Sequence, residues 1–164
     1  MTTTERAYLA GLVDGEGCIS MFSYQAGTYQ FGSMRRRGTP KYRTLVRLHI
    51  GICYGPVILW IANELGGRPF RRNVSRYNPN TKLIWTIQWS GVRAVAILKL
   101  IWPYLRVKRR QAAIAMKWIA LSERTRDFKG RWGGPAYPAW VTRRRDGYLR
   151  RMHDLNRRGA TPSR

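Results

Sequence analysis

The stretch LAGLVDGEGCI, Leu9 to Ile19, places two acidic residues, Asp14 and Glu16, on either side of a single glycine. It begins as an apolar helix and contains three glycines, the last of them Gly17. Asp and Glu together occur only 8 times in the whole chain. In most proteins a turn with two acids is an ordinary surface turn. In a chain this poor in acids, the pair becomes a candidate for chemistry.

The rest of the chain is strongly basic. Its 164 residues include 31 Lys and Arg, which gives a formal net charge of +23. Such a balance attracts polyanions. The chain is 44% hydrophobic and has seven Trp, which excludes a disordered composition. We expect a single domain over 1–164, with a core at about 5–122 and a basic C-terminal helix at about 139–158.

Nucleic acid is a better polyanionic partner than an anionic membrane. No apolar run reaches the ~18 residues that span a bilayer, and no Lys- and Arg-rich amphipathic helix stands apart as an anchor. The first residues, MTTTER, lack the basic start and apolar stretch of a secretory signal. We expect an intracellular protein of the cytoplasm, nucleoid or an organelle matrix, not a secreted or membrane-bound one.

The cysteines and histidines do not have the spacing of a metal site. Cys18 and Cys53 form neither a disulfide framework nor a C-x-x-C pair, and His49 and His153 are too scattered to complete a zinc site. Any bound metal is therefore expected to have oxygen ligands.

The hydrophobic pattern predicts a helix, two strands, a helix, two strands and further helices. We expect the first helix to have its N-cap at Thr4 and to end at the DGEG turn. Strand pairs of this kind favour an antiparallel sheet with helices on one face, an α+β fold. The expected strands are 18–24, 41–53, 68–77 and 82–89, and the later helices are 55–65, 92–102, 108–122 and 139–158.

The segment 41–53 alternates most clearly. Its apolar face holds Tyr42, Val46, Leu48, Ile50 and Ile52, and its other face holds Lys41, Arg43, Arg47 and His49. This pattern predicts a half-buried strand with a basic outer face. Arginine suits bidentate contacts with guanine in a major groove. A bias of genome composition would also raise the arginine content, but it does not explain why acids are scarce.

Asp14 and Glu16 would repel a polyanion unless a divalent cation lay between them. Oxygen ligands beside a phosphate are typical of Mg²⁺. The expected chemistry is metal-assisted hydrolysis of a phosphodiester. A calcium loop is excluded, because the D-x-[DN]-x-[DN]-G spacing is missing.

LAGLVDGEG resembles the signature of the LAGLIDADG homing endonucleases. PYLRVKRRQA, 103–112, resembles the stretch that carries the active-site lysine of this family, and HDLNRRG, 153–159, resembles its C-terminal ending. Val13 and Glu16 are conservative changes in the signature, and Gly15 replaces a small alanine. The residues that match letter for letter are Leu9, Ala10, Gly11, Leu12, Asp14 and Gly17.

The resemblance implies the αββαββα fold of this family, with a saddle-shaped antiparallel sheet. It also implies a homodimer, because the chain carries one motif and the family packs two motif helices together. Small residues let two backbones approach, at a helix-propensity cost of about 1 kcal/mol for a glycine. The expected interface residues are Leu9, Ala10, Gly11, Leu12 and Val13.

The same resemblance implies the roles of the site residues. Glu16 would bind the catalytic metal, Mg²⁺ or Mn²⁺, with the carbonyl of Gly15 helping. Asp14 is a further candidate ligand, although a structural role near the helix end is favoured for it. Lys108 would stabilise charge on the phosphate or poise the attacking water.

DNA recognition is expected along the outer face of the sheet. A strand of about ten residues spans ~33 Å, or about ten base pairs, so a dimer would read a pseudo-palindrome of about twenty. The expected DNA contacts are Ser20, Phe22, Tyr24, Lys41, Arg43, Arg47, Arg71, Asn73 and Arg76.

One family feature has no clear counterpart in the sequence. The family often has a polar residue, frequently Gln, near the end of the second strand. Gapless alignment puts Ile50 there, and a short shift offers His49 or Cys53. Two hypotheses follow: a site-specific double-strand DNA endonuclease encoded with an intron, or a non-cleaving RNA maturase or DNA-binding regulator on the same fold. Intron RNA would be a partner of a maturase.

Overall fold

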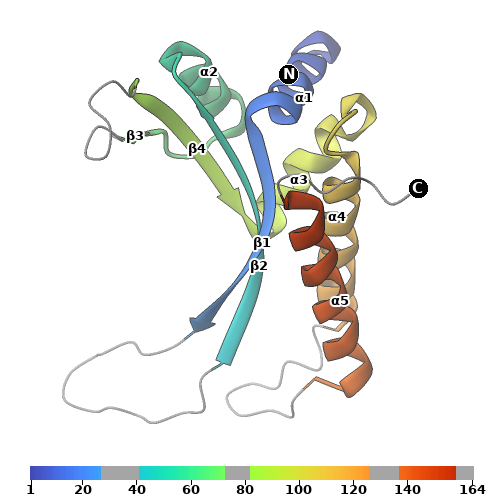
Figure 1. The fold of residues 1–164 in the computed structure, drawn as a ribbon. Helices are drawn as coiled ribbons and strands as arrows, with labels where there is room; N and C mark the ends of the chain where they lie inside the picture. Colours follow the sequence, from blue (N-terminus) through green and yellow to red (C-terminus); the bar gives the residue numbers. More distant parts are fainter. Residues whose placement is uncertain (27–40, 73–81, 126–136, 158–164) are drawn as a thin grey trace, which may run out of the picture.

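A four-stranded antiparallel sheet lies against a layer of helices (Figure 1). The computed structural model describes residues 1–26, 41–72, 82–125 and 137–157, and only the backbone at 24–26 and 41–43. The strands are β1 (Gly17–Ala26), β2 (Lys41–Ile52), β3 (Phe70–Arg72) and β4 (Ile84–Ser90), in the order β1-β2-β4-β3. The helices are α1 (Thr3–Glu16), α2 (Gly55–Leu65), α3 (Gly91–Ile101), α4 (Arg109–Arg124) and α5 (Ala139–Asn156), with a 3₁₀ turn η1 (Trp102–Tyr104).

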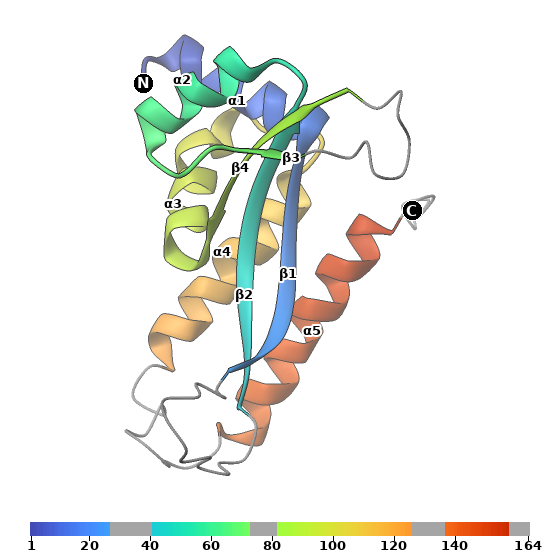
Figure 2. The same cartoon turned by 90° about the vertical axis from the view of Figure 1, so that its left-hand side faces the viewer.

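All the helices lie on the same side of the sheet. In Figure 2 the strands run in front and the helices lie behind them, which leaves one face of the sheet uncovered by helices. The predicted α+β fold, with an antiparallel sheet and helices on one face, is therefore confirmed. We call the uncovered side the outer face.

The alternation predicted in β2 decides which residues enter the core. Val46, Leu48 and Ile50 have no exposed surface, and they face the helices together with Ile19 and Met21 of β1. Ile19 pairs with Leu48, and Met21 pairs with Val46, so apolar side chains from neighbouring strands lie together on one side of the sheet. The prediction of a basic outer face is confirmed for the described part of β2, where Arg47 and His49 alternate with the buried residues.

The first helix begins two residues earlier than the sequence pattern indicated. Its N-cap is Thr2, not Thr4, because Glu5 stands three residues after Thr2 and completes a capping box. The Thr2 side chain accepts a hydrogen bond from the Glu5 backbone, and the Glu5 carboxylate accepts one from the Thr2 backbone. The predicted end of this helix at the DGEG turn is confirmed, since α1 ends at Glu16.

Gly17 lets the chain pass directly from α1 into β1. A Cβ atom at this position would lie 2.7 Å from the carbonyl oxygen of Val13 and 2.8 Å from its Cα. These are backbone atoms of the preceding helical turn, so they have little freedom to move. The position of Glu16 at the sheet edge therefore depends on a glycine after it.

The C-terminal helix belongs to the same body as the sheet. Val141 and Met152 of α5 are buried, and the Asn156 side chain donates a hydrogen bond of 2.9 Å to the carbonyl of Ile19 in β1. In the part of the chain that the structure describes, no helix is both long and apolar enough to cross a membrane.

Candidate active site and nucleic-acid interface

Asp14 is tied to the turn that precedes α4. Its Oδ2 atom accepts hydrogen bonds from the backbone N–H groups of Arg106 at 2.7 Å and Val107 at 3.1 Å, and Oδ1 accepts one from Lys108 at 2.8 Å. Partial burial tends to raise the pKa of this carboxyl. The three N–H donors and the nearby Lys108 charge outweigh burial, so the pKa of Asp14 is lowered.

These bonds give Asp14 an architectural role. A carboxylate has about four lone-pair sites, and three are occupied here by backbone donors. Metal ligation would compete with bonds that hold two segments 92 residues apart in the sequence. The geometry supports the structural role favoured for Asp14, and ligation of a metal by Asp14 stays a prediction.

Lys108 lies against the end of the motif helix. It is the N-cap residue of α4, and its ammonium donates to the carbonyl oxygens of Val13, at 3.0 Å, and Asp14. The Val13 carbonyl also accepts the backbone N–H of Gly17. Carbonyls in the last turn of a helix generally lack a partner within the helix, so the ammonium supplies one to Asp14. One of its three protons remains for a ligand at the base of α1.

Glu16 differs from Asp14 in being free. It is exposed at the last position of α1, and its carboxylate makes no hydrogen bond or ion pair with any residue in the described ranges. Within those ranges, no three His, Cys, Asp or Glu residues lie close enough to hold a metal ion together. At the end of α1, the described part of one chain thus offers one free carboxylate, so further ligands at this point would have to come from a phosphate, water or a second chain.

Three polar residues form a row across strands β1, β2 and β4 on the outer face of the sheet. Cys18 pairs with His49, and His49 pairs with Gln88 of β4. Since Glu16 precedes β1 by one residue, the β1 end of this row lies close to it in the chain. Gln88 was missed by the sequence reasoning, because only the strand order reveals that β4 lies beside β2.

The strand register places the three candidates for the family's polar position differently. Ile50 is fully buried in the core, so it cannot face a ligand on the outer face. Cys53 comes after the last residue of β2 and is exposed beyond the sheet. His49 is on the outer face and half-buried. Burial, followed by the charges of Arg47 and Arg72, lowers the pKa of His49, so its imidazole is neutral at pH 7.

Several of the predicted DNA-contact residues share this outer face. Ser20 pairs with Arg47, and the Arg47 guanidinium lies 4.9 Å from the centre of the Phe22 ring. Tyr24 pairs with Arg43 between β1 and β2, and Lys41 begins β2, but the side chains of these three residues lie outside the described atoms. Asn73 and Arg76 also lie outside the described residues.

Arg71 was predicted to lie on the outer face, and this prediction is wrong. It pairs with Trp85, and its guanidinium lies 4.6 Å from the centre of that ring. Trp85 faces the helices, since a Cβ on Gly55 of α2 would lie 2.7 Å from it. A shift of one residue in register exchanges the two faces of a strand. The outward arginine of β3 is therefore Arg72, whose charge acts on His49.

The predicted interface needs a similar correction. Leu9, Ala10 and Val13 have no exposed surface, because they pack into the core of their own chain. Such side chains cannot contact a second copy. Gly11 and Leu12 retain exposed or half-exposed surface, and the other residues on the open face of α1 are Ala7, Tyr8 and Gly15.

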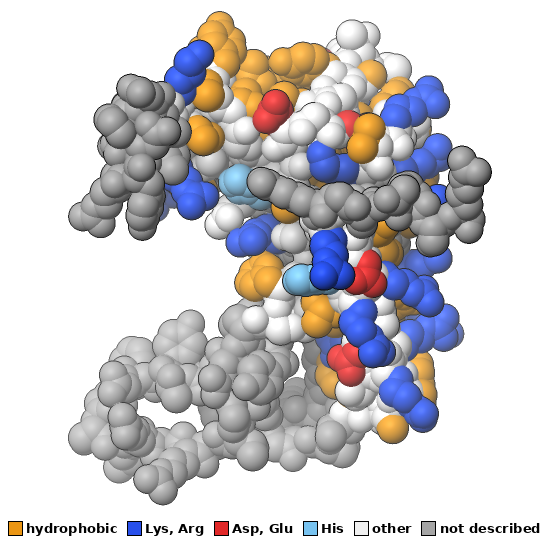
Figure 3. Space-filling view, in the orientation of Figure 1, with side chains coloured by type: hydrophobic (Ala, Val, Ile, Leu, Met, Phe, Trp, Pro, Cys, Tyr) orange, Lys and Arg blue, Asp and Glu red, His pale blue; other side chains and the backbone are white. Residues whose placement is uncertain are grey.

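The open face of α1 continues onto α2. No atom lies within 4 Å of a Cβ built on Gly11 or on Gly15. Tyr8 is 52% exposed, and its ring centre lies 5.8 Å from that of Trp60. These two rings border a hollow of about 230 Å³ together with Pro56 and Val57. Figure 3 shows hydrophobic side chains gathered over the end of the molecule that carries α1 and α2.

A motif helix that runs into an antiparallel sheet, with a free acid at the junction, is the arrangement of the LAGLIDADG homing-endonuclease fold, and solved structures confirm this fold. The chain superposes on the homing endonuclease I-CvuI, solved in complex with a DNA target, with a TM-score of 0.66 and 22% identity over 98% of this chain and 84% of that one. The archaeal intron-encoded homing endonuclease I-Vdi141I, complexed with DNA, gives a TM-score of 0.66 and 14% identity over 98% and 89%.

A longer relative in structure is also informative. The LAGLIDADG homing endonuclease I-GzeII, in complex with a DNA target, gives a TM-score of 0.59 and 11% identity over 90% of this chain but only 44% of its own length. No protein-family model and no curated protein matches the sequence.

Proposed function

We propose that the chain is a site-specific double-strand DNA endonuclease that hydrolyses phosphodiesters as a homodimer on a long pseudo-palindromic site. The observation that carries this proposal is the free carboxylate of Glu16 at the end of α1. Glu16 lies two residues after Asp14, which accepts hydrogen bonds from both the backbone N–H and the ammonium of Lys108. The outer face adds cations beside this site. The fold shared with I-CvuI, solved with DNA in the presence of Mg or Ca, supports the assignment.

Glu16 fits a hard divalent cation, Mg²⁺ or Mn²⁺, and the exposed Gly15 backbone lies beside it for a carbonyl ligand. Such a cation supplies the charge that activates water and stabilises the leaving oxygen. Side chains of the protein would stabilise the charge on the phosphate and position the attacking water. The third proton of the Lys108 ammonium is available to a phosphoryl oxygen, where it would offset developing negative charge.

His49 and Gln88 are the residues that we assign to the attacking water. They are paired on the outer face, and the lowered pKa of His49 leaves a neutral nitrogen to accept a hydrogen bond at pH 7. The amide of Gln88 is exposed beside it and can donate and accept. This pair would replace the single glutamine that the family often has near the end of its second strand. Replacing His49 with Ala should lower the cleavage rate by at least about tenfold and leave DNA affinity nearly unchanged.

The homodimer follows from the site being incomplete in one chain. Each copy contributes one free Glu16, and an approach of two α1 helices at Gly11 and Gly15 meets no side chain of the same chain. Tyr8 and Trp60 would widen the contact beyond the motif helix. The 44% coverage of I-GzeII supports this proposal, because that protein is long enough for two such units.

Replacement of Glu16 by Gln tests the function. A plasmid library with randomised inserts would first be cut by the native protein in Mg²⁺ to find a target duplex. Glu16→Gln should bind this duplex with an affinity within about threefold of native and fail to cut it. Glu123→Gln is the matched control, since Glu123 is an exposed acid on α4. Full cleavage by Glu16→Gln would refute the role of Glu16.

A non-cleaving RNA maturase or DNA-binding regulator is the second candidate. It is favoured by one observation, the buried Ile50 at the position where the family often has a glutamine. A protein of this kind would leave every plasmid of the library intact in Mg²⁺ and Mn²⁺. A maturase would also stimulate splicing of its own intron RNA.

A further inference from the structure

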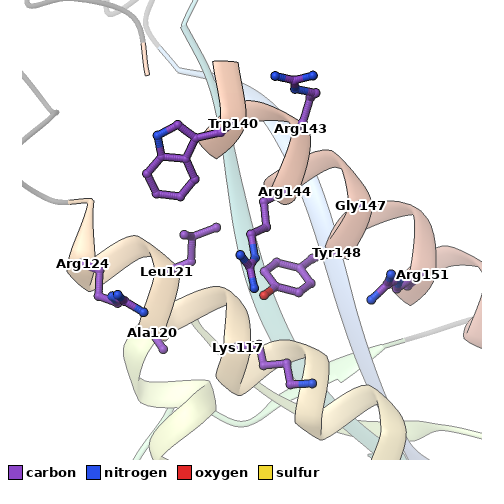
Figure 4. Close-up of a pocket in the computed structure, with 10 residues that line it drawn as sticks. All are labelled: Lys117, Ala120, Leu121, Arg124, Trp140, Arg143, Arg144, Gly147, Tyr148 and Arg151. Carbon is purple, nitrogen blue, oxygen red and sulfur yellow. The ribbon is translucent and has the colours of Figure 1, made fainter. Parts of the chain in front are cut away.

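A second basic surface lies between α4 and α5. Its groove has a volume of about 590 Å³. Figure 4 shows Leu121, Arg144 and Tyr148 between the two helices, with strands β1 and β2 running behind them. The groove is thus on the helical layer, away from the outer face of the sheet. The residues that line it are Lys117, Ala120, Leu121, Arg124, Trp140, Arg143, Arg144, Gly147, Tyr148 and Arg151.

The charges of this groove are all of one sign. Five of its ten lining residues are cations and none is an acid. Within the described residues, the ion pair that occurs joins the amino terminus to Glu64, so none of the five is neutralised there. Glu123 and Asp146 belong to the same helices but do not line the groove. A concave surface with unpaired cations concentrates phosphate groups.

The aromatic residues distinguish this groove from a plain phosphate site. Trp140 is 50% exposed, and Tyr148 is half-buried beside the apolar Leu121. Rings at a cationic surface offer planes on which unpaired bases stack, and such stacking tolerates any base. A duplex hides the faces of its bases, so it could use only the cations at the rim.

Gly147 keeps the groove open. It lies inside the 18-residue helix α5, where glycine costs about 1 kcal/mol relative to alanine. A Cβ built on it meets no atom within 4 Å, so packing does not demand a glycine. The helix therefore carries an unfavourable residue at a point where a larger side chain would project into the groove.

The spacing of the cations matches a short single strand. On α4, Lys117 and Arg124 lie seven residues apart, and on α5 Arg144 and Arg151 do the same. Seven residues of helix rise ~10.5 Å, which is about the length of three stacked nucleotides. We propose that the α4–α5 groove binds a single-stranded polynucleotide segment, with phosphates on the cations and a base on Trp140 or Tyr148. This is a second nucleic-acid site, separate from the sheet, and it does not rest on DNA cleavage.

Fluorescence anisotropy with labelled ten-nucleotide single strands of RNA and of DNA tests this proposal. Trp140→Ala should weaken binding about tenfold. Gly147→Leu should weaken it by a similar factor although no charge is lost and helix propensity improves. Arg150→Ala is the control, because Arg150 is an exposed cation of α5 that does not line the groove. Arg47→Ala on the sheet should leave single-strand binding unchanged.

The two probes also distinguish the source of the strand. Tighter binding of RNA would identify a transcript as the ligand, and tighter binding of DNA would identify a displaced or unwound strand. The proposal is overturned if Gly147→Leu binds as well as the native protein. It is also overturned if Arg150→Ala loses as much affinity as Trp140→Ala, since the attraction would then come from general charge.

Discussion

Asp14 should act as a structural clamp that joins the end of α1 to the turn before α4. Its replacement by Asn tests this role, and the hydrogen bonds of Asp14 set the expected loss of stability. Asn keeps one accepting oxygen, but its NH₂ group takes the place of the other. That NH₂ group then faces a backbone N–H whose hydrogen bond Asp14 accepts in the native protein, so two donors meet. A hydrogen bond to a charged group contributes about 1.5–3 kcal/mol, and the half-exposed position of Asp14 argues for the lower part of that range. We expect Asp14→Asn to destabilise the protein by about 2 kcal/mol.

The assay is thermal unfolding followed by circular dichroism, where about 2 kcal/mol corresponds to a fall in Tm of about 4–8 °C for a chain of this size. Asp146→Asn is the matched control, because Asp146 is an exposed acid of α5. It should shift Tm by less than about 2 °C.

The effect should also depend on pH. The pKa of Asp14 is lowered in the folded protein, whereas an unfolded Asp titrates near ~3.9. The stabilisation by the carboxylate is therefore fully present above the unfolded pKa and is lost as the pH falls through the folded pKa. The Tm difference between native protein and Asp14→Asn should stay constant from neutral pH down to about 5 and shrink below about 4. A difference of the same size at pH 3 and pH 7, or no difference at pH 7, would refute the clamp.

Four other substitutions follow from the geometry. Gly17→Ala should cost about 1–3 kcal/mol in urea unfolding, because its Cβ meets backbone atoms of Val13; native-like stability would contradict the packing. Gly11→Ala should stabilise the dilute monomer by up to about 1 kcal/mol yet weaken self-association in sedimentation, and unchanged association would argue against α1 as the interface. Arg47→Ala should weaken duplex binding and reduce the slope of log affinity against log salt by about one, whereas Arg71→Ala should change the slope little; equal effects would show that both arginines reach DNA.

Much of the fold could be predicted because the hydrophobic periodicity and the turn residues indicate the same elements along the chain. The alternation in β2 correctly divided Val46, Leu48 and Ile50 from Arg47 and His49. The predicted helix 55–65 is confirmed, and Gly66 and Gly67 follow it with φ angles of 62° and 121°. In the motif, different roles for Glu16 and Asp14 were predicted from the sequence. The backbone N–H groups that donate to Asp14 were not predicted.

The failures have physical causes. A helix has a buried side and an open side, and the motif letters alone do not say which residues of α1 lie on each. Leu9, Ala10 and Val13 therefore looked like an interface, although the sheet and the other helices of the same chain cover them. Arg71 was misplaced because a short edge strand has no alternation long enough to fix its register. Gln88 and the α4–α5 groove depend on contacts between distant segments, which no local pattern reveals.

Cleavage by mixed dimers tests most directly the central claim that two copies share one cutting site. Native and Glu16→Gln chains with different tags would be mixed, and the dimers that carry both tags would be isolated and given the selected target in Mg²⁺. Mixed dimers should bind the target like the native protein but lose double-strand cleavage, because one of the two Glu16 carboxylates is missing. Double-strand cleavage by mixed dimers at the native rate would contradict the claim.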